Sequence, residues 1–201
     1  LCNIGPSSRY SPARLVILSQ RGPNKRMSSA EQIAHYLQDC KWFAGVYPSD
    51  KMPDPASLHP GSAIIANTNS TAAPPGHVGH WIAILALNDR SKPPEYMDPY
   101  GFLPDDSDSI LGVKTNFRRY LVGASTAAGH GGAFRSSAVE IECADSDVCG
   151  EPSVHAVLHG MPADPSGKIR MPWKHIVHVI KTAGCQIGDQ YVQALVPLKK
   201  S

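Results

Sequence analysis

The sequence predicts an α+β fold in which a small mixed or antiparallel sheet is flanked by helices. Two kinds of segment predict this class. Short apolar runs bounded by turn residues are typical of strands, and other segments repeat apolar residues at helical spacing. The resulting order is helix, antiparallel strands, helix, strand and helices, which is typical of α+β proteins. The chain has 201 residues, enough for one domain with a sizeable buried core.

The first predicted helix covers residues 29–40. Ser29 and Gln32 have the spacing of a capping box, in which each side chain bonds the other residue's main-chain N–H. Apolar side chains then recur at helical spacing at Ile33, Tyr36, Leu37 and Cys40. Residues 44–61 are rich in Pro and Gly and predict a loop.

Two strands and a hairpin are predicted next. SAIIAN (62–67) is a short strand candidate, and HWIAILALN (80–88) is an apolar run bounded by turn signals, which favours a buried strand. The turn sequence DRSKPP leads from it to EYMD (95–98). We therefore expect these last two strands to pair as a hairpin.

The second half of the chain predicts one further strand and three further helices. SSAVEIE (136–142) is the strand candidate, and the loop STAAGHGGAF precedes it. The helices are indicated by apolar stripes at Ile110, Val113, Phe117, Tyr120 and Leu121, at Val154, Val157 and Leu158, and at Trp173, Ile176, Val177 and Ile180.

Charge and cysteine usage bear on partners and compartment. Residues 1–26 carry five cationic side chains and no acidic one. Because the whole chain has a net charge of +2, residues 27–201 have a net negative charge. This basic segment predicts a flexible extension ahead of a single domain over 27–201, and a site for DNA, at Arg9, Arg14, Arg21, Lys25 and Arg26. Five scattered cysteines predict mostly free thiols and a reducing intracellular compartment. No apolar run approaches the ~20 residues that span a bilayer, and we expect a monomer.

Cys149, in the stretch CADSDVCGE, is a candidate nucleophile, metal ligand, disulfide partner or buried thiol. Ser146 and Asp147 are natural N-cap residues and Pro152 is tolerated in a first turn, so a helix is predicted to begin at Cys149. A helix N-terminus lowers the pKa of a thiol, whereas the charges of Asp145 and Asp147 oppose a thiolate. A reactive Cys149 therefore needs a cationic partner.

Among nine histidines, His80 differs because it opens the most apolar strand. A ring at the mouth of a buried strand is well held and partly removed from water. Asp98 ends the predicted hairpin partner and is the expected carboxylate for orienting His80. A histidine at a strand start, an acid at the end of the next strand and a cysteine at a later helix start would form a compact site, in which His80 is a candidate partner for Cys149.

GHWIAILALN, EYMDPYGF and CADSDVCGEPSVHAVLHG together resemble adenain, the maturation cysteine protease of adenoviruses. That family has a His-Trp pair opening a strand, a [DE]-P-[FY]-G-F motif, and Cys-Gly opening a central helix with Leu-His near its end. The resemblance extends from Met27 to about Gly160. It implies an adenain-like fold, shared in its catalytic core with SUMO-deconjugating proteases, with the nucleophile at the N-terminus of the central helix.

By this resemblance Cys149 is the nucleophile, His80 the general base and Asp98 the residue orienting it, while Trp81 and Gly150 flank the site. The implied activity is thiol endopeptidase cleavage of viral capsid and core precursors, usually after glycine, in the virion and host nucleus. No cofactor is required, although DNA or a viral peptide stimulates family members. The family's disulfide-coupled peptide activation does not carry over, because HGGAFRSSAVEIE has no cysteine.

The sequence departs from the family at the oxyanion hole. The family places a glutamine six or seven residues before the nucleophile, where this chain has Cys143 and Glu142. A carboxylate cannot donate a hydrogen bond unless it is protonated. We expect the main-chain N–H of Cys149 to be one donor and the loop Ala144–Val148 to supply another, with Glu142 facing elsewhere or acting as a protonated donor.

Three other hypotheses stay open at this point. A catalytically impaired relative that binds DNA or capsid would explain the missing glutamine. A SUMO- or ubiquitin-deconjugating protease would share the core but not the substrate. A zinc module would use the thiols and imidazoles of Cys143, Cys149, His155 and His159, although its spacing is loose.

Overall fold

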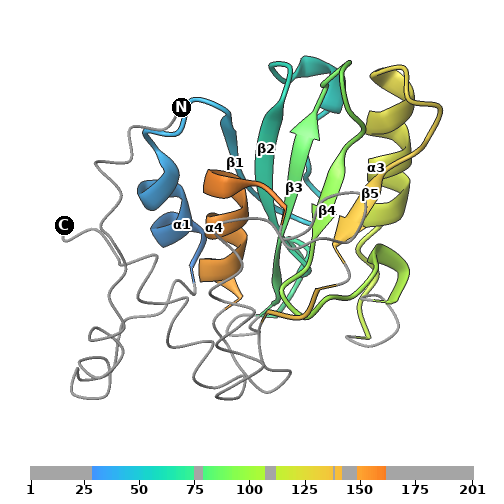
Figure 1. Ribbon diagram of the computed structural model, residues 1–201. Coiled ribbons are helices and arrows are strands. Elements are labelled where there is room, and N and C mark those ends of the chain that lie inside the picture. Colours follow the sequence, from blue (N-terminus) through green and yellow to red (C-terminus); the bar gives the residue numbers. More distant parts are fainter. Residues whose placement is uncertain (1–28, 75–78, 107–111, 138, 142–148, 162–201) are drawn as a thin grey trace.

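The computed structural model describes residues 29–74, 79–106, 112–137, 139–141 and 149–161. They form a mixed α/β structure with one five-stranded mixed sheet, which is compatible with the predicted α+β class (Figure 1). The strands lie in chain order across the sheet. They are β1 (Phe43–Pro48), β2 (Ser62–Asn67), β3 (Trp81–Leu87), β4 (Glu95–Met97) and β5 (Arg135–Ser137). The inner pairs β2–β3 and β3–β4 are antiparallel, and the outer pairs are parallel.

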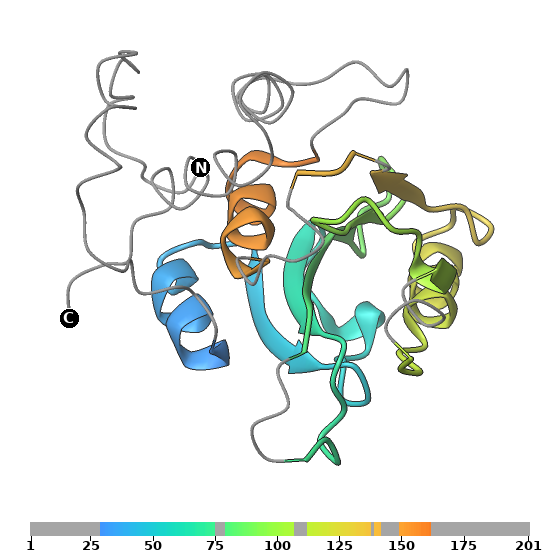
Figure 2. The same ribbon diagram turned by 90° about the horizontal axis from the view of Figure 1, so that it is seen from below.

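Helices cover both faces of the sheet. The two views agree that α1 (Ala30–Leu37) and α4 (Gly150–His159) lie on one face and α3 (Phe117–Ala127) on the other (Figures 1 and 2). Neighbouring strand residues point to opposite faces, so Ile65 packs under α1 and α4 whereas Ile64 packs under α3. Both side chains are fully buried. Each such burial contributes about 1.5–3 kcal/mol to stability.

The capping box at the start of α1 is confirmed. Ser29 Oγ accepts from the N–H of Gln32, and Gln32 Oε1 accepts from the N–H of Ser29, both at 3.2 Å. The helix ends at Leu37 rather than at residue 40. Ile33 and Leu37, one helical turn apart, enter the core next to α4.

A bulge in β3 changes which face its last residues cover. Ser62 pairs with Leu87 while Ile64 pairs with Ile84, so β3 holds one extra residue there. Ala86, within this stretch, has a left-handed φ of 56°. As a result Leu85 packs on the α4 face and Leu87 on the α3 face, although the two are only two residues apart.

The predicted hairpin is confirmed, since β3 and β4 pair antiparallel. The strand predicted over residues 62–67 is β2, and the helix predicted after Cys149 is α4. Gly160 ends α4 with a φ of 81°, a conformation that glycine adopts without a steric penalty. The apolar stripe that begins at Trp173 lies outside the described residues.

Several predicted boundaries were wrong. The loop predicted over residues 44–61 instead contains most of β1 and the 3-10 helix η3 (Pro55–Ser57). β1 is held by parallel pairing with β2, and the turn residues of the segment itself cannot reveal this contact. The helix expected around 110–121 begins at Phe117 in the described part and continues through residues 125–127, which were predicted as loop. Of the strand predicted over residues 136–142, Ser136 and Ser137 belong to β5, whereas residues 139–141 form no strand.

The expectation of mostly free thiols is wrong for Cys40, which is disulfide-bonded to a cysteine outside the described residues. Cys40 is buried directly after α1. Sequence spacing could not reveal this bond, because disulfide formation depends on closeness in space. None of the helices in the described part of the chain is long and apolar enough to cross a membrane.

Candidate active site

His80 precedes β3 and is anchored through its main chain to Thr68, which follows β2. The N–H of His80 donates to Thr68 Oγ1 at 2.9 Å, and the N–H of Thr68 donates to the His80 carbonyl at 2.9 Å. The hydroxyl of Ser49 donates to the Thr68 carbonyl at 3.1 Å. Because all three residues are buried, these bonds fix the main chain from which the imidazole projects.

Gly79 has no space for a side chain. A Cβ there would overlap Asn67 Oδ1 and would lie 2.7 Å from Asn67 Cγ and 2.8 Å from Asn69 Cγ. Asn67 Oδ1 is held where it is because it accepts from the N–H of Asn69 at 2.8 Å. The approach to His80 is therefore closely packed on the side of the loop after β2.

Asp98 meets His80 because the antiparallel hairpin brings the end of β4 beside the start of β3. His80 Nε2 lies 2.9 Å from Asp98 Oδ1. The same oxygen accepts from the N–H of Tyr100 at 2.8 Å, and Asp98 Oδ2 accepts from the hydroxyl of Tyr96 at 3.3 Å. Asp98 is fully buried, so these donors replace the water that an ionised carboxylate would otherwise bind.

The DPYGF motif is a turn that aims an aromatic ring at His80. The N–H of Gly101 donates to the Asp98 carbonyl at 2.9 Å. Gly101 has a φ of 75°, and a Cβ on it would lie 3.0 Å from the nitrogen of Glu140, so the turn favours glycine. The ring of Tyr100 then stacks on the imidazole of His80, with centroids 4.3 Å apart and planes inclined by 12°.

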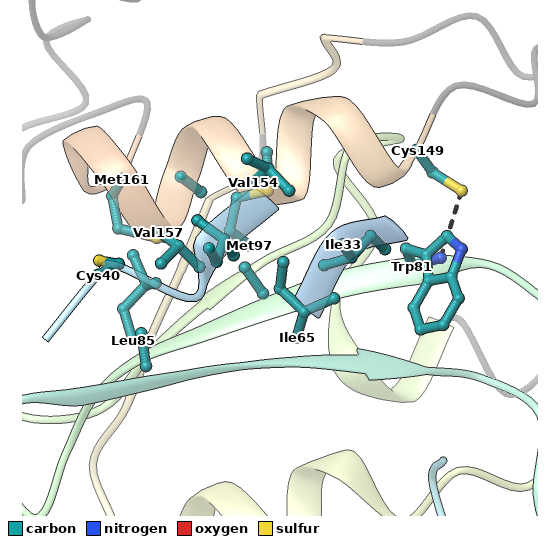
Figure 3. Close-up of a cluster of buried hydrophobic side chains, with 14 of the residues drawn as sticks. Ile33, Cys40, Ile65, Trp81, Leu85, Met97, Cys149, Val154, Val157 and Met161 are labelled. Carbon is teal, nitrogen blue, oxygen red and sulfur yellow. Dashed lines mark hydrogen bonds between the residues drawn. The ribbon is translucent and has the colours of Figure 1, made fainter. Parts of the chain in front are cut away.

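Cys149 is the N-cap residue of α4 and is buried at the end of the sheet where His80 lies. Its Sγ accepts a hydrogen bond from the N–H of Trp81 at 3.3 Å (Figure 3). That N–H belongs to the peptide unit joining His80 to Trp81, so the thiol lies against the main chain of the histidine. Cys149 is not part of a disulfide. The indole of Trp81 is buried with the apolar residues beneath α4, and Gly150 is the buried first residue of that helix.

The two nitrogens of the His80 imidazole have different surroundings, and only Nε2 bonds Asp98. An ionised Asp98 can only accept, so Nε2 carries the proton in their hydrogen bond. In that tautomer Nδ1 is the acceptor nitrogen of the ring. It is buried, and no donor or acceptor among the described residues bonds it. The imidazole that bonds Asp98 thus lies at the end of the sheet where Cys149, at the positive end of α4, contacts the main chain of Trp81.

The three residues predicted as the triad thus lie at one end of the sheet. The proposed oxyanion residues Glu142 and Ala144–Val148 lie outside the described residues, as do Cys143 and the cations of residues 1–26. Within the described ranges, no group of three or more His, Cys, Asp or Glu side chains could hold a metal ion.

Four supporting residues were missed from the sequence. Tyr96 and Tyr100 bind Asp98, Thr68 binds His80, and the hydroxyl of Ser153 donates to the Trp81 carbonyl at 3.1 Å. Ser153 could have been found from its spacing. It is four residues after Cys149, and residues four apart lie on the same face of a helix.

Models of known protein families give no match to this chain, and neither does a search of curated proteins. A function for the site therefore has to be inferred from its geometry and from the sequence motifs.

Proposed function

We propose that this chain is an adenain-type maturation cysteine endopeptidase that cleaves viral capsid or core precursor proteins near glycine residues. One observation carries the proposal. The Sγ of Cys149 lies against the peptide unit between His80 and Trp81, and the imidazole of the same His80 is bonded to the buried Asp98. The fold is proposed to be adenain-like, with α4 as the central helix. The substrate class rests on the motif resemblance.

The first half of the reaction transfers the acyl group to sulfur. His80 Nδ1 takes the proton of the Cys149 thiol, and Asp98 stabilises the imidazolium that forms. The thiolate attacks the carbonyl carbon of the scissile peptide, and the N–H of Cys149 donates to the developing oxyanion. The carbon–nitrogen bond then breaks, the imidazolium gives its proton to the leaving amine, and a thioester remains.

The second half regenerates the thiol. His80 takes a proton from a water molecule, whose oxygen attacks the thioester carbonyl. The carbon–sulfur bond breaks, the new carboxylic acid leaves, and the imidazolium returns its proton to the sulfur of Cys149. The ring of Tyr100 keeps the imidazole in one orientation through both halves, because it stacks on the face of that ring.

The test uses a peptide vinyl sulfone ending in glycine together with a library of glycine-containing peptides. We expect the wild-type protein to form one covalent adduct at Cys149 and to cleave a subset of the library. Cys149→Ala should abolish both while leaving the circular dichroism spectrum unchanged. Cys2→Ser, Cys143→Ser and Cys185→Ser are the controls. One of these three cysteines pairs with Cys40, and the two variants that keep that disulfide should label normally.

Each alternative gives a different result in this test. A protein that labels and cleaves only ubiquitin or SUMO fusions would be a deconjugating protease. A protein that neither labels nor cleaves, but gains both activities with Glu142→Gln or Cys143→Gln, would be a catalytically impaired relative. A protein that retains full cleavage as Cys149→Ala would contradict the proposal outright.

A further inference from the structure

A closed ring of hydrogen bonds links the first turn of α4 to a single residue of β3. The N–H of Trp81 donates to Cys149 Sγ at 3.3 Å, and the hydroxyl of Ser153 donates to the Trp81 carbonyl at 3.1 Å. The N–H of Ser153 donates to the Cys149 carbonyl at 3.3 Å and closes the ring within the helix. The thiol and the Ser153 hydroxyl therefore bind the two polar groups of one strand residue.

A second polar contact reaches α4 from the residue before β1, where Trp42 Nε1 donates to the Val157 carbonyl at 2.9 Å, while the side-chain packing of α4 on β3 is largely apolar. Val154 and Val157 of α4 pack with Ala83 and Leu85 of β3 in one buried cluster (Figure 3). Contacts of this kind are non-directional, so they fix the distance of the helix from the sheet more strongly than its position along a strand. A hydrogen bond is directional, and the bond from Ser153 can form at only one position of the helix along β3.

The burial of Ser153 makes this position costly to change. Its side chain is fully buried, and the Trp81 carbonyl that it serves lies in a buried strand. Moving the helix along β3 would leave both the hydroxyl and the carbonyl without a partner, away from water. The same movement would carry Cys149 Sγ away from the Trp81 N–H and from the adjoining His80.

We propose that Ser153 is a positioning residue for Cys149. Its hydroxyl sets the position of α4 along β3, and through this it sets the position of the sulfur relative to His80 Nδ1. The inference rests on the proposed function, since it assigns Ser153 a role in the same thiol site. Ser153 contacts no substrate in this role, and it acts through the main chain of Trp81.

The experiment measures the alkylation rate of Cys149 by iodoacetamide as a function of pH, with the modified peptide identified by mass spectrometry. Ser153→Ala removes the hydroxyl. The matched control is Ser125→Ala in α3, because Ser125 is also a fully buried helical serine whose hydroxyl donates to a main-chain carbonyl, that of Ala133, on the opposite face of the sheet. Both changes delete one hydrogen bond made by a fully buried serine, but only Ser153 contacts Trp81, whose N–H binds the thiol.

We expect Ser153→Ala to raise the midpoint of the alkylation profile by about one pH unit or more, because the thiolate loses its nearby imidazolium. At the wild-type pH optimum, kcat/KM for peptide cleavage should fall about 10- to 100-fold, mainly through kcat. Ser125→Ala should lower thermal stability without moving the midpoint. If the Ser153→Ala protein does not fold, Ser153→Cys replaces it, because a thiol fills the space of the hydroxyl and is only a weak donor, and mass spectrometry separates its label from that of Cys149.

The outcomes separate this inference from the proposed function. A wild-type protein with a low alkylation midpoint and a Ser153 variant with the same midpoint would overturn the positioning role and leave the proposed protease intact. Equal shifts in the Ser153 and Ser125 variants would overturn it as well, since the effect would then be one of general stability. A wild-type protein whose Cys149 reacts like an ordinary thiol and cleaves nothing would overturn both.

Discussion

Replacing Asp98 by asparagine removes one charge and almost no volume. Asp98 Oδ1 accepts from His80 Nε2 and from the N–H of Tyr100, and Oδ2 accepts from the Tyr96 hydroxyl. An asparagine can keep its oxygen at the first position and turn its NH₂ toward the Tyr96 oxygen, which can accept. The reverse orientation would place an NH₂ against the N–H of Tyr100. The structure therefore favours the amide orientation that keeps the proton on His80 Nε2.

The expected loss of rate follows from the distance between the two side chains. Unit charges 2.9 Å apart attract by about 6 kcal/mol at an effective dielectric constant of about 20. A neutral hydrogen bond retains roughly half of the strength of a charge-assisted one. Asp98→Asn should therefore raise the barrier by about 3 kcal/mol, which corresponds to roughly a 100-fold fall in kcat/KM.

The assay compares peptide cleavage and Cys149 alkylation in the wild-type, Asp98→Asn and Asp105→Asn proteins. Asp105 makes an exposed ion pair with Arg118 and provides the same chemical change far from the thiol, so its rates should stay at the wild-type level. A loss of less than about threefold for Asp98→Asn would refute the electrostatic role of Asp98. A loss on the order of 10⁴-fold would indicate the wrong histidine tautomer and refute the orienting role of the Tyr100 N–H.

Three further predictions follow from the packing and charge of other residues. Gly79→Ala should lower the free energy of unfolding by about 1–3 kcal/mol in urea titrations, because its Cβ would overlap Asn67. Gly123→Ala, where the Cβ enters open space in α3, should raise it by about 0.5–1 kcal/mol, and equal effects would contradict the steric argument. Burial, with a smaller effect of His159, lowers the pKa of His155 to about 3. Protonation of His155 is therefore less favourable in the folded than in the unfolded state. As the pH falls from about 6.5 toward 3, the free energy of unfolding should decrease by up to about 1.4 kcal/mol per pH unit. His155→Gln should flatten this dependence, and an unchanged slope would exclude His155 as its source. Deleting residues 1–26 should remove most of the salt dependence of any DNA binding measured by fluorescence anisotropy, and an unaltered dependence would move the DNA site elsewhere.

The parts of the fold that the sequence could predict are those with local signals. The capping box at Ser29, the apolar run of β3 and the short turn to β4 are each readable within a few residues. The same hairpin brings Asp98 to His80, so one half of the candidate site follows from a local pattern. The placement of Cys149 beside Trp81 depended on the motif resemblance, because about seventy residues separate them.

Other features depend on contacts that a local pattern does not contain. β1 pairs in parallel with β2, and the bulge at Ala86 is set by the register of two strands rather than by a turn sequence. The disulfide of Cys40 requires knowledge of which cysteine lies near it. Tyr100 belongs to a recognised motif, yet its stacking on His80 follows from the turn at Gly101.

The order in which these residues leave the ribosome has a consequence for the timing of activity. His80 and Asp98 are 18 residues apart, whereas the hydrogen bonds that join α4 to Trp81 and Trp42 span 68, 72 and 115 residues. Short loops close at a lower entropic cost, so we expect the histidine–aspartate pair to assemble on a nascent chain that has not yet exposed its cysteine. On the proposed function, the thiol would meet its base only after α4 (Gly150–His159) has left the ribosome. If the proposed function holds, a nascent chain that lacks α4 would be unable to cleave its neighbours.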